Sequence, residues 1–145
     1  MTIIRGMESG VSYTSIDPAG EDRFQRLRAE LEITCFGLNL LRFGPGGRSR
    51  IHRHEHQEEA YLVLEGTLTL LIEDEPRELR RGDLARVAPD VRRQLVNRTR
   101  EPLLLLAMGG ATEHEGRDGR AYRAWDETGP GSPPADVPFP DDLEV

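Results

Sequence analysis

Short apolar runs separated by glycine, proline and acidic residues fill the chain from residue 33 to residue 110. Turn-forming pairs such as Glu65-Gly66 and Gly82-Asp83 stand between them. About eight short strands at this spacing are typical of an antiparallel sandwich or barrel. The pattern therefore predicts an all-β fold, with strands near 33–43, 50–54, 59–64, 67–72, 77–79, 84–87, 93–97 and 103–108.

A short helix is predicted just before the strands. In residues 21–31, Phe24, Leu27 and Leu31 follow helical spacing, and acidic residues stand at the front, where the helix dipole favours them. The residues before it, 1–20, are polar and contain glycine, so we expect an extended arm.

The amino-acid composition of the chain changes after Gly110. Residues 111–145 are charged and rich in proline and glycine, which predicts an irregular C-terminal extension anchored by Trp125 and Phe139. The domain organisation that follows is one barrel domain within residues 1–110, with its core at about 33–110, and the extension at 111–145.

Composition narrows the class of protein. The chain has 145 residues and a formal net charge of −7, which argues against nucleic acid as a partner. The single Cys35 cannot form an internal disulfide and suits a reducing compartment. The longest aliphatic run, 103–108, is too short to span a bilayer, and the first residues lack the apolar stretch of a signal peptide. A cytoplasmic protein without a membrane partner is expected.

Three histidines alternate at positions 52, 54 and 56. In a strand, residues two apart share a face, so His52 and His54 would point into the same space, about 7 Å apart. Two imidazoles with a nearby carboxylate, such as Glu59, suit a divalent transition metal. His56 has the same parity, but a turn containing Gln57 must intervene before Glu59, so His56 is expected at the rim.

The glycines and acidic residues around these histidines resemble a known motif. Gly46, His52, His54, Glu59 and Gly66 follow one another with intervals of five, one, four and six residues. This spacing is similar throughout to the first motif of the cupins. Residues 82–97 resemble the second cupin motif at both ends, but Arg93 stands where that family has a metal-binding histidine.

The resemblance implies a double-stranded β-helix, the jelly-roll barrel of the cupins, with the ligand site inside the barrel. It implies that His52, His54 and Glu59 bind zinc, manganese, iron or nickel. It also implies a homodimer. Because the cupin barrel serves enzymes and binding proteins alike, the resemblance does not decide whether this chain is an enzyme.

Arg93 divides the functional hypothesis in two. In the first, the metal is bound, Arg93 turns aside or binds a small anionic organic ligand, and the protein is a metal-dependent oxygenase or isomerase. In the alternative, Arg93 replaces the fourth metal ligand, and the pocket is a metal-free, non-catalytic site for a small molecule. Because arginine stays protonated, a divalent ion beside Glu59 and Arg93 would leave excess positive charge unless an anion joins it. Tyr61 and Gln57 are further candidates for contact with the ligand.

Overall fold

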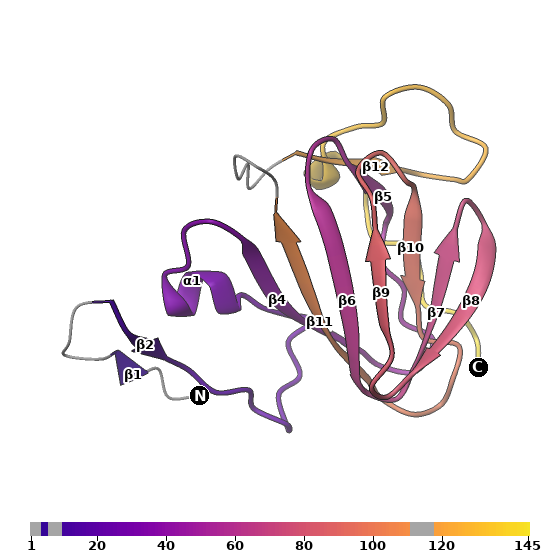
Figure 1. Ribbon diagram of the computed structural model, residues 1–145. Coiled ribbons are helices and arrows are strands. Elements are labelled where there is room, and N and C mark those ends of the chain that lie inside the picture. The colour runs from indigo at the N-terminus through magenta and orange to yellow at the C-terminus, as the bar shows by residue number, and fades with distance from the viewer. Residues whose placement is uncertain (1–3, 6–9, 111–117) are drawn as a thin grey trace.

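The computed structural model describes residues 4–5, 10–110 and 118–145. Two five-stranded antiparallel sheets pack face to face (Figure 1). One sheet contains, in spatial order, β3 (Phe24–Gln25), β4 (Gly37–Phe43), β11 (Leu103–Gly110), β6 (Glu58–Glu65) and β9 (Leu84–Val87). The other contains β12 (Gly119–Tyr122), β5 (Ile51–His54), β10 (Arg93–Val96), β7 (Thr67–Ile72) and β8 (Glu75–Arg80). A separate pair, β1 (Ile4–Arg5) and β2 (Ser12–Tyr13), lies in the N-terminal arm. This confirms the predicted all-β double-stranded β-helix.

The core lies between the two sheets and follows from alternation along the strands. In β11, Leu103, Leu105 and Ala107 are buried, and the residues between them face outward. The inward-facing apolar side chains of both sheets form one cluster: Leu41, Phe43, Tyr61, Val63, Leu68, Leu70, Leu79, Val87, Leu95, Leu103, Leu105 and Ala107. Several members of this cluster border the site described below.

The glycines at the two ends of the first motif are required because other backbone segments pack closely against them. Gly46 has φ +76° and Gly66 has φ +84°, a region that favours glycine. A Cβ atom at Gly46 would collide with the carbonyl oxygen of Leu143, and one at Gly66 with that of Pro102. The glycine spacing of the motif therefore reflects how tightly the turns pack.

The helix is shorter than the predicted 21–31. Helix α1 spans Leu27–Leu31 and buries Leu27, while Phe24 and Gln25 form β3 and pair with Leu41 and Leu40 of β4. The amphipathic spacing is present, but hydrogen bonding to the open edge of β4 competes with the helix at its first turns.

The C-terminal extension supplies a strand that the sequence pattern does not predict. Strand β12 pairs with β5 along its whole length, so the extension completes the sheet that carries the histidines. A short 3₁₀ helix, η1 (Pro134–Asp136), follows. The last residues then return to the barrel, where the Leu143 amide donates to the Gly46 carbonyl at 2.7 Å.

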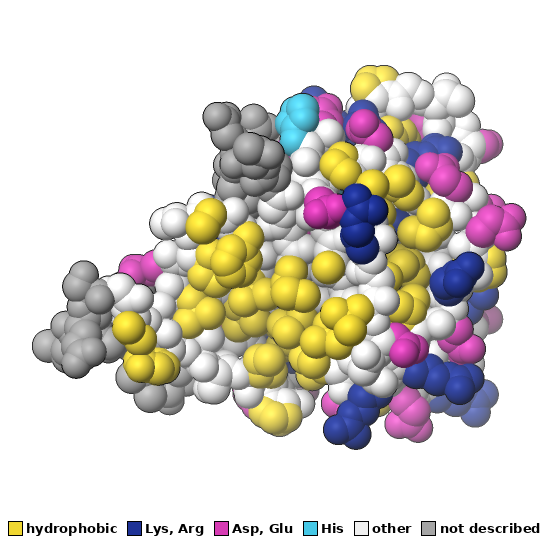
Figure 2. All heavy atoms as spheres, viewed as in Figure 1, with side chains coloured by type: hydrophobic (Ala, Val, Ile, Leu, Met, Phe, Trp, Pro, Cys, Tyr) yellow, Lys and Arg dark blue, Asp and Glu magenta, His cyan; other side chains and the backbone are white. Residues whose placement is uncertain are grey.

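The outer face of the β3–β4–β11–β6–β9 sheet is largely apolar (Figure 2). Leu84 and Phe36 are exposed, and Leu62, Leu104 and Leu106 are half-buried. A homodimer would need a surface of this kind, and the homodimer stays a prediction from the family resemblance.

Within the described residues, no helix has the length and apolar character needed to cross a membrane.

Candidate metal centre

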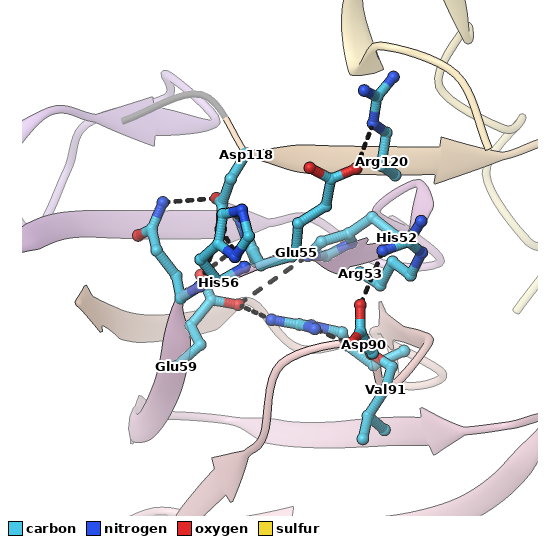
Figure 3. Close-up of polar contacts among 12 residues, drawn as sticks. His52, Arg53, Glu55, His56, Glu59, Asp90, Val91, Asp118 and Arg120 are labelled. Carbon is cyan, nitrogen blue, oxygen red and sulfur yellow. Dashed lines mark hydrogen bonds and ion pairs between the residues drawn. The ribbon is translucent and has the colours of Figure 1, made fainter. Parts of the chain in front are cut away.

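Three of the predicted residues converge inside the barrel, and Figure 3 labels two of them, His52 and Glu59. His52 and His54 come from β5 and Glu59 from the start of β6, after the turn at residues 55–57. One ligand atom from each lies within 4.8 Å of the others. The Nε2 atom of His54 is 3.4 Å from Glu59 Oε2, and that of His52 is 3.9 Å from Glu59 Oε1. His56 is exposed and lies outside this cluster, as expected.

Both imidazoles are fixed through their other ring nitrogen. His52 Nδ1 donates to the carbonyl oxygen of Arg50 at 3.0 Å, and His54 Nδ1 lies 2.8 Å from Asp118 Oδ1. Burial lowers the pKa of His52, and the nearby Glu59 carboxylate offsets this only in part. For His54, burial is outweighed by the Glu59 and Asp118 carboxylates, which raise its pKa. With Nδ1 engaged in each ring, Nε2 faces Glu59 and would be the atom that binds a metal, which is the orientation that metal-binding histidines adopt.

Asp118 supports this arrangement, and its side chain is only 1% exposed. Its Oδ2 accepts hydrogen bonds from the backbone amides of His56 and Gln57, and its Oδ1 accepts one from Gln57 Nε2 at 2.6 Å. Burial raises the pKa of Asp118, but these bonds and the contact with His54 outweigh burial and hold the pKa below its ordinary value. Sequence reasoning missed Asp118, because only the pairing of β12 with β5 brings it beside His54.

Arg93 is fully buried and lies directly opposite His52 in the neighbouring strand β10. Its Nη2 donates to Glu59 Oε1 at 2.7 Å, its Nη1 to the Val91 carbonyl at 2.9 Å, and its Nε to the Tyr61 hydroxyl at 3.2 Å. The Tyr61 hydroxyl also donates to Glu59 Oε1. Arg93 therefore occupies the position that the second motif predicts, and it forms an ion pair with Glu59.

The residues around Glu59 keep its carboxyl group ionised. Burial raises the pKa of Glu59, but the adjacent His52 and His54 imidazoles and the charge of Arg93 outweigh burial and hold the pKa well below its usual range. Glu59 Oε1 is occupied by Arg93 and Tyr61, while Oε2 faces His54. One carboxylate oxygen is thus available as a ligand.

Two cavities meet at the cluster. A cavity of 210 Å³ inside the barrel is bordered by His52, His54, Glu59 and Tyr61 together with apolar side chains. A second cavity, of 420 Å³, also reaches His54 and Glu59 and is bordered by Gln57. Tyr61 and Gln57 therefore lie where a ligand would contact them, whereas Arg93 is not among the residues that line either cavity.

The residues present fit a divalent transition metal. Two oriented imidazole nitrogens and one carboxylate oxygen are a common donor set for such ions, and the outward bonds from His52 and His54 match the support that such ligands usually have. Asp118 also changes the charge balance. With its negative charge counted, a divalent ion beside Glu59 and Arg93 would leave about one unit of positive charge instead of two.

Comparison with known proteins agrees with the fold. Residues 39–109 match the cupin domain family. Among curated proteins, none matches the sequence. A sugar phosphate isomerase of the cupin superfamily from Silicibacter pomeroyi is 36% identical, with a TM-score of 0.57, over 61% of this chain and 59% of that one. This chain therefore covers less than two thirds of that protein's length.

Two further structures match a larger share of the chain. A cupin 2 conserved barrel domain protein from Salinispora arenicola is 25% identical over 74% of this chain and 91% of that one, with a TM-score of 0.61. A cupin from Bacteroides fragilis is 24% identical over 85% and 99%, with a TM-score of 0.65, and shows the shared fold. The protein is therefore a small cupin, with its cupin domain at residues 39–109.

Proposed function

We propose that this cupin binds a divalent transition metal through His52, His54 and Glu59, and a small anionic organic molecule in the adjoining barrel cavity. The observation that carries the proposal is the convergence of three donor atoms within 4.8 Å, with both imidazoles anchored through Nδ1. Three protein ligands leave coordination positions for water or a ligand, which suits catalysis more than a closed structural site.

The surrounding side chains have separate roles in this proposal. Arg93 and Tyr61 hold Glu59 Oε1 and thereby keep the carboxylate ionised and oriented. Asp118 holds His54 in place, and the apolar wall of the barrel limits the water that reaches the cluster. When bound, the metal would supply Lewis-acid polarisation of a ligand oxygen.

Isomerisation is the reaction class that the comparisons favour. The protein from Silicibacter pomeroyi, named as a sugar phosphate isomerase, has the same fold and 36% identity over the matched region. We therefore place metal-assisted isomerisation of a small hydroxy- or oxo-compound ahead of oxygenation. Both remain reaction classes that a site with open metal positions supports.

The second candidate function is metal-free binding of a small molecule without catalysis. It is favoured by one observation, the fully buried Arg93, which already neutralises Glu59. In this case the Glu59–Arg93 ion pair takes the place of a metal, and the ligand is held by hydrogen bonds alone.

Calorimetric titration of Zn²⁺ into metal-depleted, untagged protein tests the proposal. We expect one site per chain, and we expect His54→Ala to weaken binding at least about 100-fold because a ligand is lost. His56→Ala is the matched control and is expected to leave the affinity unchanged. Equal weakening by the two substitutions would show that Zn²⁺ binds to surface histidines, and no binding by the wild type would favour the metal-free alternative.

A further inference from the structure

Two arginines that border the 210 Å³ barrel cavity have side chains with no role in the metal site. Arg50 immediately precedes β5 and stands two residues before His52, and it borders the same cavity as the imidazoles. Arg23 borders this cavity from the segment that leads into β3. Phe139, from the C-terminal extension, contacts both arginines.

Both guanidinium groups stack on the ring of Phe139. The Cζ atom of Arg23 is 4.6 Å from the ring centroid, and that of Arg50 is 3.8 Å from it. Stacking uses the face of a guanidinium group and leaves its N–H edge available for hydrogen bonds. The ring therefore orients two cationic groups without engaging their N–H donors.

The positive charge of this pair is poorly balanced in the described part of the chain. Arg50 donates through Nε to the Val137 carbonyl at 2.6 Å, and no acceptor among the described residues meets its two terminal nitrogens. Arg23 donates to the Arg48 carbonyl, and its carboxylate neighbour, Asp142, is 4.0 Å away and 64% exposed. Two adjacent cations with one distant, solvated counter-charge favour an anion between them and the cavity.

The residues that line the cavity indicate what the rest of the ligand is like. Leu41, Phe43, Leu95 and Ala107 are among the residues that line it. Its 210 Å³ is below the range of about 300–1,000 Å³ that holds drug-sized ligands. The space therefore suits a compact apolar body.

We propose that Arg50 and Arg23 bind the carboxylate of a small acid with an apolar body, whose other end reaches the His52–His54–Glu59 cluster. This inference rests on the proposed ligand-binding function and names its ligand class. Arg50 and His52 are two residues apart, about 7 Å along the strand, so a ligand with its carboxylate at Arg50 needs a body of about one ring to reach the cluster.

Cyclohexanecarboxylate and its uncharged analogue cyclohexanecarboxamide are suitable probes, and their binding to the full-length protein is measured by ligand-observed NMR, with and without Zn²⁺. We expect the wild type to prefer the acid about tenfold or more, since charge-assisted bonds to arginine are lost with the amide. Arg50→Gln should weaken binding of the acid about tenfold and leave binding of the amide unchanged. Arg23→Gln should act in the same direction.

Arg28→Gln is the matched control, because Arg28 borders the second cavity and does not border the 210 Å³ cavity. We expect it to leave both affinities unchanged. If Arg50→Gln does not fold, Arg50→Lys, which keeps the charge, should retain a reduced preference for the acid. No preference in the wild type, or a preference removed by Arg28→Gln and not by Arg50→Gln, would overturn the inference.

The outcome is separable from that of the metal titration. A preference for the acid that depends on Arg50 in metal-free protein, together with failure to bind Zn²⁺, would support this inference and overturn the proposed metal site. Zn²⁺ binding without any preference for the acid would do the reverse.

Discussion

Replacing Arg93 by methionine should lower the free energy of unfolding of the metal-free protein by about 3–5 kcal/mol. The reason is that Glu59, which is 14% exposed, would lose the cation that neutralises it and would remain as a nearly unpaired charge. Methionine keeps much of the apolar volume, so the loss reports the charge and its hydrogen bonds. The measurement is urea denaturation in the presence of a chelator.

Two comparisons isolate the ion pair. Arg93→Met combined with Glu59→Gln should recover most of the loss, because neither charge is then left alone. Arg86→Met removes the partner of Glu58, the neighbouring residue, but Arg86 is 65% exposed, and a change of only about 0–1 kcal/mol is expected. An equal effect of Arg86→Met and Arg93→Met would contradict the assigned role of Arg93.

Metal should rescue the Arg93→Met variant. A divalent ion at the cluster would supply the positive charge that Glu59 has lost, so saturating Zn²⁺ should stabilise the variant more than the wild type. Stabilisation of the wild type alone would mean that Arg93 assists metal binding directly.

Asp118→Asn is the second substitution with a large expected effect. The two carboxylate oxygens of Asp118 now accept four hydrogen bonds, from His54, from the His56 amide and from two groups of Gln57. The asparagine NH₂ group cannot accept, so some of these donors would lose their partner. We therefore expect the free energy of unfolding to fall by about 3 kcal/mol at a pH of about 7. Because His54 loses its anchor, the dissociation constant for Zn²⁺ should rise about 10–100-fold. Urea denaturation and calorimetric titration measure the two effects.

The effect of Asp118→Asn on stability should depend on pH. The pKa of Asp118 is lowered in the folded protein, so its contribution to stability is present above the pKa of the unfolded chain, about 4, and is lost as pH falls through the folded value. The stability difference between wild type and Asp118→Asn should therefore shrink below a pH of about 4. Asp90→Asn is the control, because the Asp90 carboxylate is 72% exposed and pairs with Arg53 at the surface. A difference that stays constant down to low pH would contradict the role of the Asp118 charge.

The sequence predicted the part of the site that depends on local geometry. His52 and His54 share a face because strand side chains alternate, and Glu59 follows after one turn in the next strand. The glycine spacing was equally informative, since Gly46 and Gly66 are positions where the backbone leaves no room for a side chain. The second motif also indicated that Arg93 belongs beside this cluster, and it lies opposite His52.

The remaining features depend on contacts between distant segments. Asp118 is 64 residues from His54, and no local spacing signals that β12 pairs with β5. The position of Phe139 against two arginines depends on the path of the C-terminal extension in the same way. The predicted helix at 21–31 was too long because pairing with β4 outweighed the helical pattern of its first residues.

Metal binding by His52, His54 and Glu59, in the presence of the buried Arg93, is the point on which the proposed function depends. Elemental analysis of untagged protein, with His52→Ala purified in parallel, decides it. We expect close to one equivalent of zinc, manganese, iron or nickel in the wild type and little in the variant. Wild-type protein that contains no metal and takes up none when it is added would show that these three residues do not form a metal site.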